Sequence, residues 1–357
     1  MNHYPNNYEL SRKDLMYKNL RKFKKQLLKE GKSEELKNFD FYPLTYYMPT
    51  EYSNLINIIK ENPNKVYIMK PAGRSQGFGI FLVTNIDQII KWKNSLKGKE
   101  DNIINELYIA QEYIMNPLLL GGRKFDMRIY ALVNNFNPLS IWLCRTGFAR
   151  FTHARYNNIF DDTNSNFVHL TNVAVQKTCA NYNASLGGKW NLRNMKLYMY
   201  SKFGVEKVES LFSKIKNIII KSITSVSKII VNDKHCFEIY GYDILIKDNL
   251  EPVLIEINSN SSLTANTIED KKLKVNMLDD VLSILDIEKL LTGTETQIGS
   301  FDLIYKSNKE INKPSYYKYN TNLGSFDNRE KQMKSLAKST YNRLKKLNEQ
   351  KNLYINK

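Results

Sequence analysis

The stretch YGYDILIKDNLEPVLIEIN, residues 240–258, predicts two apolar strands joined by a KDN turn. Asp243 lies on the first strand, and Glu256 and Asn258 lie on the second. Glu256 and Asn258 are two positions apart, so both point to one face of their strand. Three oxygen donors on otherwise apolar strands are typical of a Mg²⁺ site that nucleotide phosphates complete. The alternative is a set of solvent-facing polar positions on an edge hairpin.

A second hairpin is predicted around KPAGRSQGFGIFLV, residues 70–83. Apolar runs rich in β-forming residues flank the glycines, which therefore fall in the turn between two strands. Backbone N–H groups in such a loop, together with Lys70 and Arg74, suit a polyphosphate. The pattern is neither a P-loop nor a dinucleotide fingerprint, because no helix follows it. The alternative is an ordinary glycine-rich turn.

The composition indicates a folded protein with room for two or three domains, since the chain has 357 residues and 42% hydrophobic content. The N-terminus is polar, and no uncharged apolar run approaches the roughly 20 residues of a membrane span. Cys144, Cys179 and Cys236 lie far apart without C-x-x-C spacing. We therefore expect reduced thiols in the cytosol and no membrane partner.

The net charge of +17 predicts an acidic partner, which could be nucleic acid, anionic lipid or an acidic protein surface. Residues 301–357 hold 13 Lys and Arg against 5 Asp and Glu, and their apolar spacing predicts a basic amphipathic helix. A second basic segment runs from Arg12 to Lys25. No nucleic-acid-binding signature is present, so we expect no nucleic-acid partner. The alternative for both segments is a solvated helix face.

Five separated motifs occur in the order KPAGRSQGFGI, QEYI, GGRKFDMRIY, HLTN and EINSNSSL. These strings and their order closely resemble the tubulin tyrosine ligase-like family of ATP-grasp amino-acid ligases, from about Tyr8 to about Tyr305. The strings GGKW, NDKHCFEIYGYDI and LTGTETQIGSFDL, with GGRKFDMRIY, resemble its compact polyglutamylase branch. The resemblance implies an α+β ATP-grasp fold in which two α+β subdomains clamp ATP.

The pattern of elements and charge along the chain, combined with this resemblance, predicts four segments. A small basic N-terminal module covers residues 1–64, and a central subdomain with the glycine-rich lid and the hinge covers residues 65–143. A C-terminal subdomain with the metal hairpin covers residues 144–293, and a basic tail covers residues 294–357.

The resemblance also assigns site residues. Those it implies for ATP are Lys70, Gly73, Arg74, Gln76, Gly77, Gly79, Gln111, Glu112, Tyr113, Ile114, Lys124, Asp126, Thr171 and Asn172. Arg150 and Lys189 would hold the carboxylates of the incoming amino acid, and Asp243, Glu256 and Asn258 would hold Mg²⁺. Lys70, Arg150 and Glu256 are the implied catalytic residues. The alternatives are that Arg150 is a surface residue and that Lys189 covers the ring of Trp190.

The implied function is ATP-dependent addition of free glutamate to glutamate side chains of tubulin C-terminal tails, through an acyl phosphate. Microtubules and accessory subunits are the implied partners, and the cytoplasmic cytoskeleton, in a cilium, flagellum or basal body, is the implied location. The alternatives are a glycine or tyrosine ligase of the same fold and a catalytically silent microtubule-binding module. Phe78 replaces a basic residue usual in the family, which affects lid charge. Residues 259–262 stand where the family usually has Ala-Ser-Pro-Ser, in the loop that the resemblance expects to meet the acceptor tail.

Overall fold

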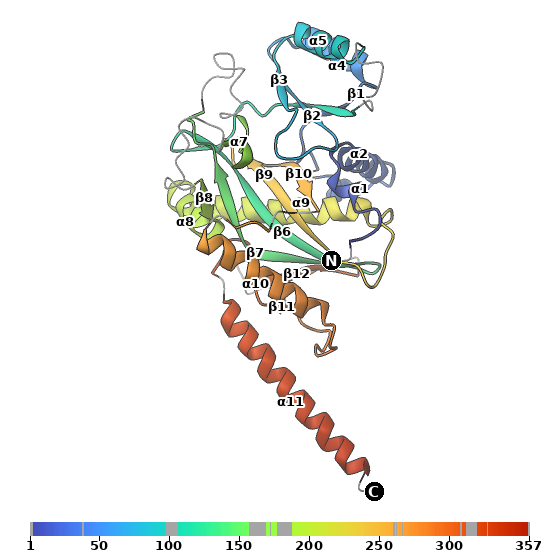
Figure 1. Cartoon of the computed structure of the whole chain (residues 1–357), viewed down its shortest axis with the longest axis vertical. Coiled ribbons are helices and arrows are strands. Elements are labelled where there is room, and N and C mark those ends of the chain that lie inside the picture. Colours follow the sequence, from blue (N-terminus) through green and yellow to red (C-terminus); the bar gives the residue numbers. More distant parts are fainter. Residues whose placement is uncertain are drawn as a thin grey trace.

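The chain has a mixed α+β fold with two antiparallel sheets, as the sequence predicts for its fold class (Figure 1). The structure is a computed structural model. It describes residues 3–37, 39–97, 106–156, 169–171, 173–176, 188–259, 261, 263–265, 267–307, 309–311, 320–326 and 328–355.

The smaller sheet has four strands in the order β1-β4-β2-β3. Its strands are β1 (Thr45–Met48), β2 (Tyr67–Pro71), β3 (Phe81–Val83) and β4 (Tyr108–Glu112). Helices α4 (Tyr52–Glu61) and α5 (Ile86–Lys97) lie beyond this sheet at the end of the molecule opposite the C-terminus (Figure 1). Tyr67, Met69 and Val83 pack with Leu55 of α4 and Ile89 of α5 in one buried cluster. The predicted hairpin on either side of the glycine-rich loop is confirmed by the pairing of β2 with β3.

The larger sheet has nine strands, six of them in the order β10-β9-β6-β7-β12-β11. These strands are β6 (Arg123–Phe136), β7 (Leu139–Phe151), β9 (Glu238–Ile246), β10 (Pro252–Asn258), β11 (Gln297–Ile298) and β12 (Phe301–Lys306). The short strands β5 (Leu119–Leu120), β8 (Lys189–Asn191) and β13 (Lys309–Glu310) pair with β6, β7 and β12. The predicted hairpin over residues 240–258 is confirmed as β9 and β10.

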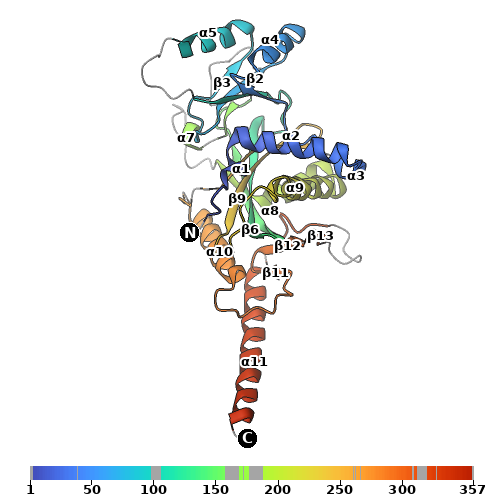
Figure 2. The same ribbon diagram turned by 90° about the vertical axis from the view of Figure 1, so that its right-hand side faces the viewer.

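The alternation of side chains along β6 decides what each face of the larger sheet meets. Met127 and Ile129 point into the main core, which they share with α9 (Val205–Val226). Tyr130 and Leu132 point to the opposite face, where α10 (Ile268–Leu285) covers them. Figure 2 shows the two helices on opposite sides of the sheet. The even-numbered side chains of β6 therefore lie on the same face as α10. Near the start of the strand, these side chains are the charged residues Lys124, Asp126 and Arg128.

Two helices, α8 (Leu192–Phe203) and α9, follow one another between β8 and β9. Gly204 ends the first helix with φ of +84°, a conformation that favours glycine. Two short helices, α1 (Tyr8–Ser11) and α3 (Ser33–Leu36), flank the longer α2 (Lys13–Lys29). One further turn, α7 (Val173–Gln176), lies near the glycine-rich loop.

Strands from all four predicted segments contribute to the two sheets. Strand β1, from residues 1–64, pairs with β4, and β12, from residues 294–357, pairs with β7. The boundary predicted between residues 143 and 144 falls inside β7. The sheets therefore do not follow the predicted boundaries, and the division into ATP-grasp subdomains stays a prediction.

The C-terminal helix α11 (Arg329–Ile355) projects away from the two sheets (Figures 1 and 2). Arg329 anchors its first turn, because the guanidinium donates to Asp280 at 2.8 Å and also pairs with Asp279. Tyr341 and Leu344 are exposed. The predicted basic helix in the tail is thus confirmed as a helix. Within the described residues, no helix combines the length and the apolar character needed to cross a membrane.

Candidate active site

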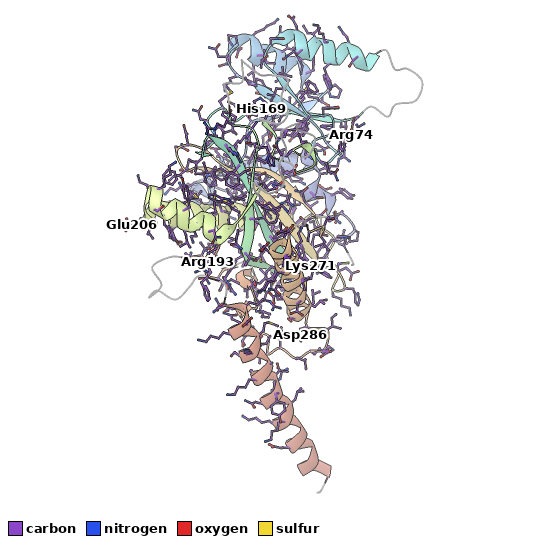
Figure 3. All side chains as sticks on the ribbon, turned by 60° about the vertical axis from the view of Figure 1, so that its left-hand side comes forward. Arg74, His169, Arg193, Glu206, Lys271 and Asp286 are labelled. Carbon is purple, nitrogen blue, oxygen red and sulfur yellow. The ribbon has the colours of Figure 1, made fainter. Side chains whose placement is uncertain are left out.

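A cleft between the two sheets brings together most of the residues that the sequence assigned to the site. The predicted residues that line it are Lys70, Arg74, Gln76, Gly77, Gln111, Glu112, Tyr113, Ile114, Lys124, Asp126, Arg150, Thr171, Asp243 and Glu256. Four predicted residues, Gly73, Gly79, Lys189 and Asn258, are not part of this lining, and Asn172 lies outside the described residues. The smaller sheet with its helices and the larger sheet with its helices form two lobes, and Figure 3 shows Arg74 and His169 at the junction of these lobes.

The glycine-rich loop, residues 72–80, forms the upper edge of the cleft. Gly77 has φ of +82°, and a Cβ atom at this position would lie 2.8 Å from a methyl group of Val175 in α7. A glycine is thus required at position 77, because the backbone conformation disfavours other residues and because a side chain would meet Val175. Arg74 is mostly exposed and pairs with Glu106 at 2.5 Å, and Phe78 is 65% exposed. From this loop the cleft is lined by Arg74, Ser75, Gln76, Gly77 and Ile80, while Phe78 is exposed and is not part of the lining.

Lys70 is a buried cation at the base of this loop. Its Nζ donates to Gln111 Oε1 at 2.7 Å, and the Gln111 amide in turn donates to the Thr45 hydroxyl at 3.1 Å. Burial lowers the pKa of Lys70 to about 8, although the nearby Glu256 carboxylate acts in the opposite direction. The side-chain oxygen of Gln111 thus holds Lys70 in place.

Lys124 is a second buried cation on the opposite wall. Its Nζ donates to the Tyr113 hydroxyl and to the backbone carbonyl of His169, each at 2.9 Å. Burial is the main reason that the pKa of Lys124 falls to about 7, and the charge of Lys70 adds to the effect. Two lysines held in a polar cleft with lowered pKa values are a common feature of functional sites.

Four charged side chains form a buried ion-pair network on the wall made by β6, β7 and β9. Arg150 donates through Nε to Asp126 at 2.8 Å and contacts Asp243 at 2.7 Å through Nη2. Arg128 also pairs with Asp243, at 2.5 Å. Thr171 donates to Asp126 at 2.8 Å. Because Arg150 is only 7% exposed, its interpretation as a surface residue is wrong.

The register of the sheet places the carboxylates of Asp243 and Glu256 on paired positions of β9 and β10. Asp243 is 2% exposed, so the solvent-facing alternative is wrong for it. Burial alone would raise the pKa of Asp243, but the guanidinium groups of Arg128 and Arg150 outweigh burial and hold that pKa below its usual range. Asp243 is therefore ionised at neutral pH.

The donor set of Asp243, Glu256 and Asn258 fits a Mg²⁺ ion. Asn258 lies two positions after Glu256 and donates to Glu256 Oε1 at 3.3 Å, so the two side chains share one face as predicted. An ionised carboxylate has about four lone-pair positions, so Asp243 can bind a cation while it accepts from two arginines. No group of three or more His, Cys, Asp or Glu side chains that could hold a metal occurs among the described residues. An ion here would thus need nucleotide phosphates as further ligands.

Lys189 belongs to a second cavity next to the cleft. Thr171 lines both cavities, and Lys189 is paired in register with Arg150 across β8 and β7. Its Nζ contacts Asp270 Oδ2 at 2.9 Å and lies 4.5 Å from the centre of the Phe148 ring. The ammonium of Lys189 therefore lies over Phe148, and Trp190 is not the ring beneath it.

Two charged residues of the site are absent from the sequence prediction: Lys13, which lines the cleft, and Arg128, which contacts Asp243. Lys13, at the first position of α2, donates to the carbonyl of Arg74 at 2.9 Å and lies 3.5 Å from Glu256 Oε2. Arg128 holds Asp243, as described above. Lys13 is 8% exposed, so this member of the basic segment from Arg12 to Lys25 is not available to attract a partner from solvent. Arg128 could have been found from its position two residues after Asp126, on the same face of β6.

The fold and the cleft define an α+β protein in which two antiparallel sheets enclose buried lysines and an arginine–carboxylate network. A profile of the tubulin-tyrosine ligase family matches residues 1–296. The chain belongs to this family.

Three relatives are similar over most of the chain. The probable tubulin polyglutamylase TTLL9 of Bos taurus is 43% identical over 376 aligned positions, which cover 95% of this chain and 81% of the relative. The probable alpha-tubulin polyglutamylase Ttll1 of Tetrahymena thermophila is 43% identical over 328 positions, covering 87% of this chain and 79% of the relative. Tubulin polyglutamylase TTLL5 of Mus musculus is 32% identical over 300 positions, covering 80% of this chain and 21% of the relative.

Proposed function

We propose that the protein is a tubulin polyglutamylase, an ATP-dependent ligase that adds glutamate to glutamate side chains of tubulin C-terminal tails. The observation that carries the proposal is the cleft itself, where buried cations and the paired carboxylates of Asp243 and Glu256 meet under a glycine-rich loop. Three similar proteins named as tubulin polyglutamylases support the choice of substrate. The cleft is the nucleotide site of an ATP-grasp arrangement of the two lobes.

The reaction has two steps. First, a carboxylate oxygen of a tail glutamate attacks the γ-phosphorus of ATP, the bond to the leaving oxygen breaks, and ADP departs. Second, the amine nitrogen of free glutamate attacks the acyl carbon of the resulting acyl phosphate. A C–N bond forms, inorganic phosphate leaves and the amine loses a proton. No nucleophilic side chain is needed, so the protein acts mainly by positioning and by charge stabilisation.

The residues of the cleft divide these tasks. Lys70 and Lys124 neutralise the phosphates from opposite walls, and the backbone of the glycine-rich loop covers them. Asp243, Glu256 and Asn258 would hold Mg²⁺, which when bound supplies positive charge to the oxygens of the transferring phosphoryl group.

Arg150 and Lys189 bind the carboxylates of the incoming amino acid. Arg150 has N–H donors left for this role. Asp126 and Asp243 contact only its Nε and Nη2, and a guanidinium group carries five N–H donors. Two cations favour glutamate over glycine or tyrosine as the substrate, because glutamate carries a second carboxylate.

The assay that tests this function mixes the purified protein with microtubules, ATP, Mg²⁺, labelled glutamate and candidate accessory subunits, followed by mass spectrometry of the tails. The expected result is glutamate on tail side chains. Incorporation of glycine or tyrosine would favour the alternative ligases, and absence of any incorporation together with absence of Mg-ATP binding would favour a silent microtubule-binding module. The proposed location is the cytoplasmic cytoskeleton, at a cilium, flagellum or basal body.

A further inference from the structure

The first turn of α2 lies against the strand that carries Glu256. The Ser259 hydroxyl donates to the Ser11 hydroxyl at 3.2 Å, and the Tyr17 hydroxyl donates to the carbonyl of Ile255 at 2.8 Å. Lys13 lies between these two contacts and reaches Glu256 Oε2 at 3.5 Å. Residues from the start of the chain thus follow β10 past its carboxylate, and Figure 2 shows α1 and α2 beside the larger sheet, below the smaller one.

Lys13 also reaches the lobe on the other side of the cleft. Its Nζ donates to the backbone carbonyl of Arg74 in the glycine-rich loop at 2.9 Å. One ammonium group therefore joins the loop that covers the cleft to a carboxylate on the wall of the cleft. Among the described residues that line the cleft, Lys13 alone comes from the helices that precede β1.

The position of Lys13 is costly for a lysine that only supports the fold. It is the first residue of a 17-residue helix, where the partial positive charge of the helix disfavours a cation. It is also buried, which removes much of the hydration of its ammonium. The contacts with Arg74 and Glu256 offset these costs, and both partners belong to the cleft.

We propose that Lys13 is a positioning residue of the nucleotide site: it holds the glycine-rich loop at the cleft and orients the carboxylate of Glu256. The N-terminal helix is then part of the nucleotide site and not a separate module that attracts the acceptor. This inference rests on the proposed function, because it assigns Lys13 to the same site. Its consequence is that loop closure and nucleotide affinity depend on a residue outside the motifs that mark the cleft.

The test compares Lys13→Met with Lys18→Met, which removes an exposed lysine from the same helix. The two measurements are hydrogen exchange of the amides in residues 72–80 and the dissociation constant of Mg-ATP by calorimetry. In Lys13→Met we expect faster exchange of the loop and an affinity at least about tenfold weaker, since a hydrogen bond from a charged donor is lost. Lys18→Met should match the unchanged protein in both.

Lys13→Arg keeps the charge and should restore part of the affinity. It also keeps the proposal testable if Lys13→Met fails to fold. Two results would show that Lys13 only supports the fold. One is a folded Lys13→Met whose loop exchange and Mg-ATP affinity equal those of Lys18→Met. The other is a Lys13→Met that does not fold, together with a Lys13→Arg that matches the unchanged protein in both measurements.

Neither measurement needs tubulin or glutamate, so this test is separate from that of the proposed function. If the unchanged protein binds Mg-ATP but adds no glutamate, the proposed reaction fails and the role of Lys13 is still decided by the two variants. If it binds no Mg-ATP, the proposed function fails, and loop exchange in the nucleotide-free protein decides whether Lys13 holds the loop.

Discussion

The wall of the cleft and the loop that faces it are built in different ways. On the wall, Asp126, Arg150 and Asp243 are buried and hold one another through ion pairs. In the loop, Arg74 and Phe78 are largely exposed, and glycine supplies the backbone conformation at position 77. A buried ion-pair network is held in a single arrangement, whereas an exposed loop can open at a low cost in free energy. In the proposed function, the wall places charge and the loop closes over the nucleotide.

The largest effect is expected from breaking the wall. Arg150→Met leaves two buried carboxylates, Asp126 and Asp243, without their shared partner. Removing one member of a buried ion-pair network typically costs about 3–5 kcal/mol of stability. We expect a loss of that order in the free energy of unfolding, measured with urea, together with loss of ligation. Arg155→Met, at an exposed arginine, is the control and should change stability by less than about 0.5 kcal/mol. Equal urea midpoints for the two variants would mean that the wall does not depend on Arg150.

A smaller and more local effect is expected in the loop. Gly77→Ala puts a methyl group against Val175 in a backbone conformation that disfavours alanine, whereas a Cβ at Gly73 has no neighbour within 4 Å. We expect Gly77→Ala to weaken Mg-ATP binding about tenfold, and Gly73→Ala to leave it nearly unchanged. Calorimetric titration of both variants measures this. Equal affinities in the two would contradict the assignment of closure to the loop.

The pH dependence of nucleotide binding should come from the buried lysines and not from the exposed loop. Because burial lowers the pKa of Lys124 to about 7, its ammonium is lost above neutral pH in the free protein. Bound phosphates favour the charged form, so binding takes up a proton and affinity falls as pH rises from 7 to 8.5, by up to about tenfold per unit. Lys70, with a pKa of about 8, adds to the fall at higher pH. Calorimetry in two buffers of different ionisation enthalpy detects the proton. Lys124→Arg should flatten the profile, and an unchanged profile would rule Lys124 out as its source.

The smallest effect is expected from substitutions in α11, which belongs to neither the wall nor the loop. Its exposed Lys345 and Lys346 would attract acidic tubulin tails through solvent, where the field fades over about 8 Å at physiological salt. Changing both to Glu should weaken co-sedimentation with microtubules several-fold at low salt and little at high salt. The same double change at Lys60 and Lys91, on the outer helices of the smaller lobe, is the control. Equal binding of both variants at low salt would make α11 an ordinary solvated helix.

Local patterns in the sequence predicted the two hairpins of the site, whereas Asp126 and Arg150 of the wall were assigned only by the family resemblance. Alternation along β9 and β10 placed Asp243 opposite the Glu256 strand, and the glycines marked the loop between β2 and β3. Lys13 could not be predicted, because its contacts with Arg74 and Glu256 join positions 61 and more than 200 residues apart. The sequence feature that could have indicated its role was a lysine at the start of a helix, where a cation is disfavoured. The pairing of β12 with β7 was missed for the same reason, since it is set by packing across distant segments.

The proposed coupling of ATP cleavage to isopeptide formation in the cleft can be measured by counting ADP and incorporated glutamate in one reaction. The comparison is between the unchanged protein and Glu256→Gln, with microtubules and accessory subunits present. We predict one ADP for each glutamate added in the unchanged protein. Glu256→Gln should lose both products together by roughly 10²–10³-fold at an unchanged melting temperature, because a near-isosteric neutral group replaces the carboxylate. A Glu256→Gln protein with an unchanged melting temperature and a near-normal rate would contradict the account.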